Sequence, residues 1–281
     1  MSHKTIAVLH PGEMGAAIGA GLAARGHRIL WASAGRGEAT RKRAERCGLE
    51  DAGTLARAVQ AADIVFSVCP PHAALDLARA VAACGYGGVY VDANAVSAET
   101  TRAAGRVVEA AGASYVDAGI IGPPPSPGAS VRLYLCGGRA AEVAPLFEGQ
   151  VMRAIVLDAP LGAASALKVC YAAWNKGATA LLAGIRALAD QEGVDAALLA
   201  EWSISQPDIP KRSEVVTVSA RKAWRWIAEM EEIAASFEAA GLPAGFHLAA
   251  ADIYRRLEGF KDAPGPPALS EVKAALLRGK H

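Results

Sequence analysis

Hydrophobic and polar positions follow two different patterns along this chain. In the first 160 residues, short apolar runs recur and helix-like stretches separate most of them. The apolar runs are Ile6–Leu9, Ile29–Ala32, Ile64–Val68, Val89–Val91, Tyr115–Val116 and Leu133–Leu135. The helix-like stretches include Gly15–Arg25, Ala73–Ala83 and Ala98–Ala111. Because parallel strands need crossover connections of about this length, we expect a mainly parallel, doubly wound sheet with helices on both faces.

The pattern changes after about Pro160. Residues 120–130 (IIGPPPSPGAS) contain too much Pro and Gly for a helix or strand and predict an ordered loop at the mouth of the sheet. Residues 162–192 are nearly free of helix breakers and predict one long helix. Further helices are expected at Asp195–Ser203, Val215–Ala240 and Phe246–Leu257, with a short one near the end. The simplest architecture is an α/β domain over 1–160 followed by an all-helical domain over 161–281.

Composition and charge narrow the functional classes. The 281 residues are 52% hydrophobic and 20% charged, which is typical of a globular protein, and the formal net charge is +1. Neither half has a basic excess, so nucleic acid and membrane partners are not expected. The chain shows neither a membrane-length apolar run nor a signal-peptide core, and we expect a cytoplasmic protein. Five scattered cysteines without CxxC pairs predict reduced, packed thiols and no metal site.

The stretch IAVLHPGEMGAAIGAGL, residues 6–22, resembles a strand, a glycine-containing turn and a helix. Gly12 and Gly15 match the second and third glycines of a dinucleotide-binding turn, and His10 replaces the first. A helix that begins near Met14 would present unpaired N–H groups to a phosphate. The alternative is an ordinary tight turn. The position at the start of an alternating α/β half favours a nucleotide cradle.

The end of the second apolar run bears on the choice of nucleotide. An NAD-binding sheet usually places an acidic residue there, but this chain has Ser33 and no acid before Glu38. Four polar or basic residues are expected to form a pocket for a 2′-phosphate: Ser33, Arg36, Thr40 and Arg41. The alternative is a solvated basic helix start. We expect NADP(H) as cofactor.

Several segments in order resemble the β-hydroxyacid dehydrogenase and 6-phosphogluconate dehydrogenase superfamily. They are PGEMG (11–15), FSVCPP (66–71), VDANAVSAETT (91–101), YVDAGIIGPPP (115–125) and GAASALKVCYAAWNKG (162–177). The C-terminal stretch 222–243 resembles a branch with a helical domain of unknown function. The resemblance implies an NADP-binding Rossmann domain over 1–160. It also implies a helical domain for substrate binding and dimerisation over 161–281.

The resemblance also implies which residues contact the cofactor. The turn residues are Pro11, Gly12, Glu13, Met14 and Gly15. Cys69, Pro70 and Pro71 would lie against a cofactor ribose, and Asn94 would approach the nicotinamide ribose. Ser97 has a competing explanation, because with Thr100 and Thr101 nearby it is favourably placed to cap the following helix.

Lys168 is the expected catalytic residue. The superfamily carries a lysine in this setting, which implies a general acid/base at the substrate oxygen. Independently, Lys168, Tyr171 and Asn175 share one face of a helix that is otherwise rich in alanine and leucine, with Ser165 one turn earlier. A lysine in a partly dry cleft has its pKa lowered towards the useful range. The alternative is a lysine that snorkels at a helix surface.

Three positions depart from the superfamily pattern. Ala172 replaces an asparagine, so that Tyr171 or Asn175 would have to compensate, and Glu231-Glu232 replaces a Lys-Asp pair. The substrate loop, commonly Ser-Gly-Gly, is here Ile121, Gly122 and Pro123, which offers fewer donors to a carboxylate. A bulkier or less acidic hydroxy or keto compound therefore fits better than a simple 3-hydroxy acid.

Three functional hypotheses follow. The first is an NADP(H)-dependent oxidoreductase that transfers hydride between nicotinamide and a hydroxy or keto compound. The second is an imine (C=N) reductase, and the third is a non-catalytic NADP(H)-binding sensor. We also expect a homodimer through the helical domain. An apolar stripe there favours a core or subunit interface over a substrate pocket: Trp224, Trp226, Met230, Ile233 and Phe237.

Overall fold

The computed structural model describes residues 3–261 and 263–278. The chain divides into two compact units, Met1–Val169 and Cys170–His281, and each is described by itself. The division falls inside the long helix α7 (Ala163–Gln191), whereas the sequence placed a domain boundary near residue 160.

The first unit contains an eight-stranded sheet in the order β3-β2-β1-β4-β5-β6-β7-β8. Its strands are β1 Thr5–Leu9, β2 Arg28–Trp31, β3 Glu50–Asp51, β4 Ile64–Ser67, β5 Val89–Asp92, β6 Ser114–Ile121, β7 Val131–Cys136 and β8 Met152–Val156. All neighbouring pairs are parallel except β6 with β7. The predicted, mainly parallel, doubly wound sheet is therefore confirmed.

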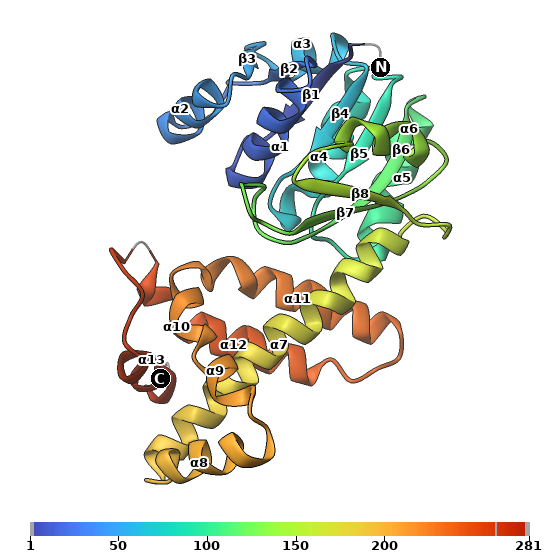
Figure 1. The fold of residues 1–281 in the computed structure, drawn as a ribbon. Helices are drawn as coiled ribbons and strands as arrows, with labels where there is room; N and C mark the ends of the chain where they lie inside the picture. Colours follow the sequence, from blue (N-terminus) through green and yellow to red (C-terminus); the bar gives the residue numbers. More distant parts are fainter. Residues whose placement is uncertain (1–2, 262, 279–281) are drawn as a thin grey trace. The chain divides into compact units, whose positions relative to one another are not determined.

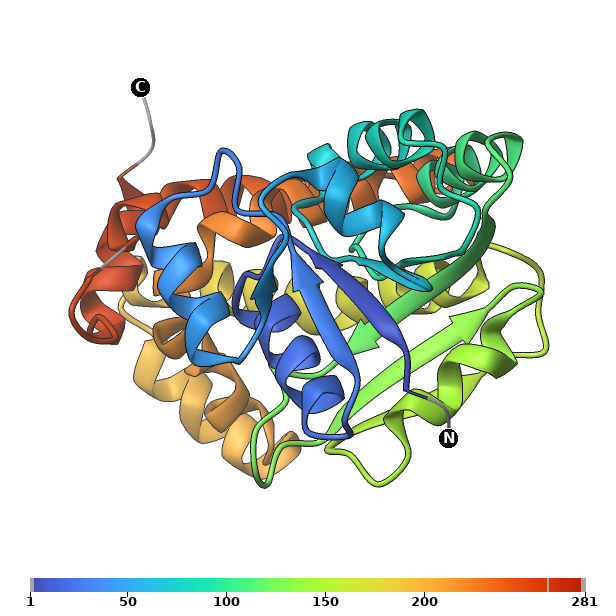
Figure 2. The ribbon, with the colours of Figure 1, turned by 90° about the horizontal axis from the view of Figure 1, so that it is seen from above.

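Helices cover both faces of this sheet, because both sides of its central strands are apolar. Ile6 and Val8 of β1 pack in one core with α1 and α6, whereas Ala7 and Leu9 pack in a second core with α3, α4 and α5. Figure 2 shows these layers on opposite sides of the strands. The helices are α1 Glu13–Ala23, α2 Glu38–Arg46, α3 Leu55–Gln60, η1 Pro71–Ala73, α4 Ala74–Ala83, α5 Ala98–Ala110, α6 Ala140–Val143 and η2 Ala144–Phe147. The alternation along each strand is the period expected of a sheet buried on both faces.

The second unit is helical (Figure 1). After α7 it contains α8 Asp195–Ser205, α9 Ile209–Ser213, α10 Val215–Ser219, η3 Ala220–Lys222, α11 Trp224–Ala239, α12 Gly245–Arg256, η4 Glu258–Phe260 and α13 Leu269–Leu277. The long helix predicted over 162–192 is confirmed as α7. Among the helices of the described residues, none is long and apolar enough to cross a membrane.

One predicted helix was wrong in its length. The sequence predicts a single helix over 215–240, but a 3-10 turn (η3) separates α10 from α11. No Gly or Pro marks this break. Ala220 and Ala223 are almost completely buried there, so tertiary packing overrides their high helix propensity.

Candidate active site at the carboxyl edge of the sheet

One register row crosses four strands near their carboxyl ends. Leu9 pairs with Ser67, Ser67 with Asp92, and Asp92 with Asp117. The residues that follow this row leave β1, β4 and β5 along one edge, and β6 continues past the row to Ile121. Chain connectivity reverses between β1 and β4, and the order of the first six strands, 3-2-1-4-5-6, is that of dinucleotide-binding sheets. From β2 to β6 this edge spans roughly 19 Å, at about 4.8 Å per strand.

The turn between β1 and α1 has the features of a phosphate cradle. Gly12 is the N-cap of α1 and no side chain caps this end, so the first N–H groups of the helix remain available. A Cβ added at Gly12 would meet no atom within 4 Å, which leaves the space in front of the turn open. A Cβ added at Gly15 would lie 2.8 Å from the carbonyl oxygen of His10, so glycine allows the helix to pack this closely. The turn fits a dinucleotide pyrophosphate.

The other residues of the turn have different surroundings. Pro11 is buried, and its carbonyl oxygen accepts a hydrogen bond of 3.4 Å from Arg43 Nη1 on α2. Met14 packs against the sheet core, and Glu13 is exposed in the first turn of α1. The sequence did not identify Arg43 as a residue of the site, because it lies 32 positions after Pro11 and no local motif links the two.

Of the side chains predicted to bind a 2′-phosphate, some already form hydrogen bonds within the protein. Arg41 donates from Nη2 to the carbonyl oxygen of Ser33 at 3.0 Å and from Nε to that of Arg36 at 3.2 Å, so it holds the loop after β2. The Arg36 guanidinium makes no hydrogen bond or ion pair with a residue that the structure describes. Its positive charge acts to lower the pKa of both His10, which follows β1, and Cys69, which follows β4. Thr40 is half-buried in α2.

Asp51 is a residue that sequence reasoning missed. It lies at the end of β3, in register with Trp31 of β2, and interacts with Ser33 through hydrogen bonds. Desolvation acts to raise the pKa of the exposed Asp51 carboxyl, but hydrogen bonds from Ser33 and the Gly53 N–H and the charge of Arg41 lower it overall. A carboxylate therefore stands at the end of the strand next to β2, supplied by a strand of two residues that leaves little sequence pattern.

Asn94 organises the ends of β4 and β5. Its Oδ1 accepts a hydrogen bond of 2.6 Å from the Cys69 N–H, and its Nδ2 donates to Ser67 Oγ at 2.8 Å and to Asp92 Oδ1 at 2.6 Å. Asn94 is 3% exposed. Its side-chain amide is therefore engaged with the protein and fixes the backbone from which Pro70 and Pro71 follow.

Two titratable groups in this region have shifted pKa values, the buried Asp92 and the partly buried Cys69. Burial raises the pKa of Asp92 to about 6, and the charge of Asp117 adds to this, while hydrogen bonds from Tyr115 and Asn94 act in the opposite direction. Burial, followed by the charge of Asp92, raises the pKa of the Cys69 thiol to about 12. Cys69 is therefore a protonated packing residue at neutral pH rather than a nucleophile.

Ser97 is a helix cap, as its surroundings in the sequence predict. Its hydroxyl oxygen accepts a hydrogen bond of 3.1 Å from the Thr100 N–H at the start of α5. Thr101 is fully buried and shares a hydrogen bond of 2.8 Å with Ser165 of α7.

Strand β6 positions the start of α7, and with it Lys168. The Asp117 carboxylate accepts hydrogen bonds from the N–H groups of Ala164 and Ser165, at 3.0 and 3.1 Å, and from Ser165 Oγ at 2.6 Å. Two residues further along β6, a Cβ on Gly119 would collide with the Ala164 carbonyl oxygen and would lie 3.3 Å from Lys168 Cβ. The stem of Lys168 therefore lies against the carboxyl end of β6, on the same edge as the nucleotide turn.

Tyr171 and Asn175 follow Lys168 on α7 and belong to the second unit. Tyr171 is 45% exposed. Asn175 Nδ2 donates to the Tyr171 carbonyl oxygen at 2.9 Å, so its amide is partly used within the helix. Ala172 is buried. That Tyr171 or Asn175 replaces the missing asparagine stays a prediction.

The loop expected at the substrate begins one residue later than its motif suggests. Ile121 is the last residue of β6, is paired with Arg132 and is buried. Gly122 has a φ of +128°. A Cβ there would lie 2.6 Å from the Ser130 carbonyl oxygen, so glycine is required at this exit from the strand. Pro123 is exposed. Gly122 and Pro123 remain the candidates for substrate contact.

In the helical unit, the apolar stripe of α11 is divided between core and surface. Met230 and Ile233 are buried, whereas Trp224 is 36% exposed and lies under Lys261. Glu231 pairs with Arg255 at 2.7 Å. Close to this stripe lies an ion pair that sequence reasoning missed.

This ion pair joins Lys176 of α7 to Glu229 of α11, and both side chains are largely buried. The Lys176 ammonium also lies 5.2 Å from the centroid of the Trp226 ring. The two residues are 53 positions apart, so the contact is produced by tertiary packing rather than by a local motif.

Comparisons with known proteins agree with this architecture. Residues 5–149 match the model for the NAD binding domain of 6-phosphogluconate dehydrogenase, and residues 189–257 match a domain of unknown function, DUF1932. An uncharacterised 28.5 kDa protein from Methanothermus fervidus is 29% identical over 166 residues, which span 57% of this chain and 61% of that protein.

Two solved structures show the same fold. Mycobacterium tuberculosis 3-hydroxyisobutyrate dehydrogenase has a TM-score of 0.72 and 20% identity, covering 99% of this chain and all of that one. An imine reductase from Bacillus cereus has a TM-score of 0.59 and 17% identity, covering 99% of this chain and all of that one. At these identities the likeness concerns the fold alone.

The sheet order and the open glycine turn define a Rossmann-type protein with a nicotinamide-dinucleotide-binding domain. The chain belongs to the family with the NAD-binding domain of 6-phosphogluconate dehydrogenase, in a branch that carries the DUF1932 helical domain. Its fold is that of the hydroxyacid dehydrogenases.

Proposed function

We propose that this protein is an NADP(H)-dependent oxidoreductase that acts on a hydroxy or keto compound, with Lys168 as the general acid/base. The observation that carries the proposal is the arrangement along one sheet edge. The phosphate turn lies at the end of β1, and the stem of Lys168 lies against Gly119 at the end of β6. A nicotinamide cofactor would supply or accept the hydride.

The chain's own residues would perform the remaining steps. Gly12 and the first turn of α1 bind the pyrophosphate, and the Asn94 network holds the turn at Cys69. Lys168 Nζ donates a proton to the substrate oxygen during reduction and removes it during oxidation. Asp117 and Gly119 keep this lysine in place through the first turn of α7.

The test is a screen of carbonyl compounds in which turnover is measured as the loss of NADPH absorbance. On a substrate that is turned over, we expect Lys168→Ala to lower kcat by 10²–10⁴-fold and to leave the Kd for NADPH within about threefold. Lys211→Ala, at an exposed position on α9, is the matched control and should behave as wild type. Full turnover by the Lys168 variant would disprove its assigned role.

The preference for NADP(H) is supported by Arg36, whose guanidinium has no ion-pair partner among the described residues. Asp51 is an opposing feature, because a carboxylate repels a 2′-phosphate and can accept from a ribose 2′-hydroxyl. We expect Arg36→Ala to weaken NADPH binding by roughly 10- to 150-fold, about 1.5–3 kcal/mol, with little change for NADH. Asp51→Asn should strengthen NADPH binding. Equal losses for both cofactors in the Arg36 variant would contradict the assignment.

Imine reduction is the second candidate function. It is supported by the altered loop, where Ile121 is buried in β6 and Pro123 offers no N–H to a substrate carboxylate. A panel of cyclic imines tested beside hydroxy acids separates the two activities. Tight NADPH binding without turnover on either panel would instead indicate the third hypothesis, a non-catalytic sensor.

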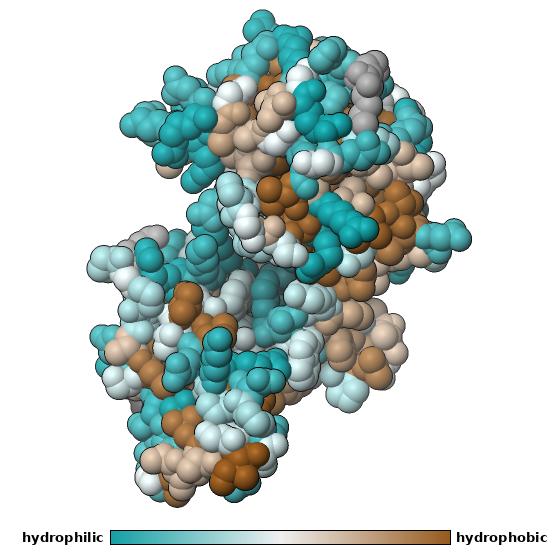
Figure 3. Space-filling model, viewed as in Figure 1, coloured by the Kyte–Doolittle hydropathy of each residue, from teal (hydrophilic) through white to brown (hydrophobic). Residues whose placement is uncertain are grey.

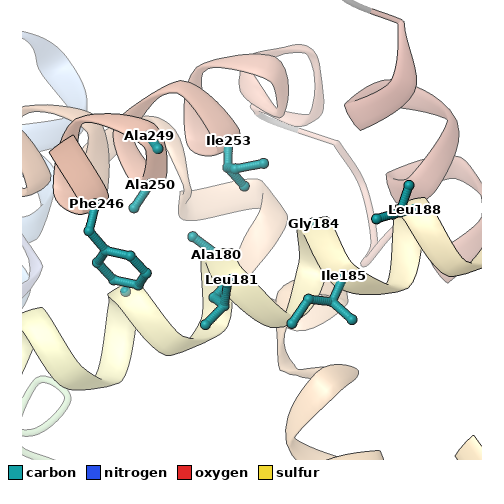
Figure 4. Close-up of a pocket in the computed structure, with 10 residues that line it drawn as sticks. Ala180, Leu181, Gly184, Ile185, Leu188, Phe246, Ala249, Ala250 and Ile253 are labelled. Carbon is teal, nitrogen blue, oxygen red and sulfur yellow. The ribbon is translucent and has the colours of Figure 1, made fainter. Parts of the chain in front are cut away.

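We also propose a homodimer through the helical unit. Trp174, Leu181 and Leu188 of α7 are 63%, 48% and 58% exposed and recur every seven residues, which is the spacing of helices that pack side by side. Two apolar grooves of about 300 and 490 Å³ accompany them, and Leu181 and Phe246 line both. Figure 4 shows the smaller groove between α7 and α12. In the space-filling view of Figure 3, which shows one side of the molecule, hydrophobic residues lie scattered among hydrophilic ones on the helical unit. A second copy of this chain, which would pack the same face of α7 against this one, is the occupant we propose.

A further inference from the structure

His10 is an unusual residue for its position. It directly follows β1 at the point where the strand order reverses. Its φ is +64°, and it is the one non-glycine residue with a positive φ in the part of the chain that the structure describes. Glycine adopts this conformation without strain, whereas a histidine does not. The turn therefore carries an imidazole where a side chain is conformationally unfavourable.

The backbone of His10 is firmly held, so this conformation is part of the turn. Its carbonyl oxygen accepts a hydrogen bond of 2.7 Å from the Gly12 N–H. The same oxygen packs against Gly15, where a Cβ would lie only 2.8 Å away. The imidazole consequently leaves the chain at a defined place beside the phosphate cradle.

The imidazole also has an unused polar atom. His10 Nδ1 is buried and has no hydrogen-bond partner among the described residues. Burial, followed by the positive charge of Arg36, lowers the pKa of His10 to about 4, so the ring is neutral at physiological pH. A buried nitrogen without a partner is costly, and a ligand oxygen at hydrogen-bond distance would remove that cost.

We propose that His10 is a cofactor-binding residue. On the basis of the proposed function, its Nδ1 forms a hydrogen bond with an oxygen of the nucleotide's ribose-phosphate part, beside Arg36. In the usual fingerprint the first glycine serves the tight turn and has no side chain to offer. Here the turn is kept by a strained histidine, and the imidazole adds a contact that glycine lacks.

Two substitutions at this position separate the contact from the backbone. His10→Gly removes the imidazole and relieves the strained φ. We expect it to raise the Kd for NADPH about tenfold in titration calorimetry, with a Tm equal to or above that of wild type. His10→Asn keeps a short polar side chain that tolerates positive φ and places an amide atom near the Nδ1 position. It should bind NADPH within about threefold of wild type.

His27 offers a matched control, because it is buried and lies before β2, at the opposite edge of the sheet. Its Nδ1 accepts the Lys4 N–H at 3.2 Å. His27→Asn should lower the Tm and leave the Kd for NADPH unchanged.

The outcomes distinguish this inference from the proposed function. Unchanged NADPH binding by His10→Gly, together with tight binding by wild type, would overturn the role of His10 and leave the oxidoreductase proposal intact. Failure of the wild-type protein to bind either NADPH or NADH would overturn both. A loss in His10→Asn equal to that in His10→Gly would also contradict the proposed hydrogen bond.

Discussion

At the scale of single residues, the carboxyl edge of the sheet is governed by buried polar groups. Asp92 is completely enclosed and its partners are neutral: the Tyr115 hydroxyl at 2.7 Å, and the side-chain amide and backbone N–H of Asn94. Tyr90 and Cys69 lie close by, and Asp117 is the nearest acidic influence. Because these partners supply no positive charge to offset burial, the pKa of Asp92 lies above its usual value.

This predicts a pH dependence of stability. Burial raises the pKa of Asp92 from 3.8 to about 6 in the folded protein. Between these values the folded state retains a proton that the unfolded state has lost, so the contribution of Asp92 is fully present below pH 4 and is lost as the pH rises to about 6. Relative to Asp92→Asn, the wild-type protein should lose roughly 3 kcal/mol of unfolding free energy between pH 4 and pH 7.

Urea unfolding at several pH values measures this difference. Asp76→Asn is a suitable control, since the Asp76 side chain is 79% exposed on α4, and its curve should run parallel to that of wild type. A parallel curve for Asp92→Asn as well would show that Asp92 is not protonated in this range.

The same scale shows what the sequence could and could not predict about the site. The turn at Gly12, the close packing at Gly15 and the Ser97 cap were predictable because each depends on neighbours within a few positions. Asp51 and Arg43 were not, because Asp51 contacts Ser33 and Arg43 contacts Pro11, each from a distant segment of the chain.

At the scale of secondary-structure elements, the start of α7 is the most constrained part of the site. Its first turn is held by Asp117 of β6, by Thr101 of α5 through Ser165, and by close packing on Gly119. A carboxylate at a helix N-terminus is favoured by both hydrogen bonding and the helix dipole. The element that carries Lys168 is thus anchored to the same sheet that carries the nucleotide turn.

Removing this anchor should be strongly destabilising. Asp117→Ala leaves the N–H groups of Ala164 and Ser165 and the Ser165 hydroxyl without their buried acceptor. We expect a loss of about 3 kcal/mol in the free energy of unfolding, measured with urea. Asp158→Ala, in the exposed segment after β8, should change it by less than about 0.5 kcal/mol. A small effect at Asp117 would mean that packing on Gly119 alone holds the helix.

Elements with a strong local pattern were predictable, and those defined by their neighbours were not. The six apolar runs became strands, and residues 162–192 became α7. Strands β3 and β8 were missed: β3 has two exposed acidic residues, and β8 carries arginine at its second position. Their pairing with β2 and β7 is a tertiary contact, which a single-sequence pattern does not contain.

At the scale of the whole molecule, charge gives no reason for association with other classes of macromolecule. The formal net charge is +1. The helical unit instead exposes large apolar side chains on α7 and α12, including Trp174, Leu188 and Phe246. Contiguous apolar surface of this kind usually marks an interface.

The proposed dimer can be tested by disrupting this surface. Wild type should sediment as a dimer, because a stable interface buries on the order of 1,600 Å² and the exposed stripe runs along a 29-residue helix. Leu181→Glu places a charge where two apolar grooves meet, and should shift the protein towards monomer in analytical ultracentrifugation. Leu242→Glu carries the same change at a residue that is 53% exposed but lies outside both grooves, so it should remain dimeric. If Leu181→Glu and wild type sediment alike, the second copy does not bind this face of α7.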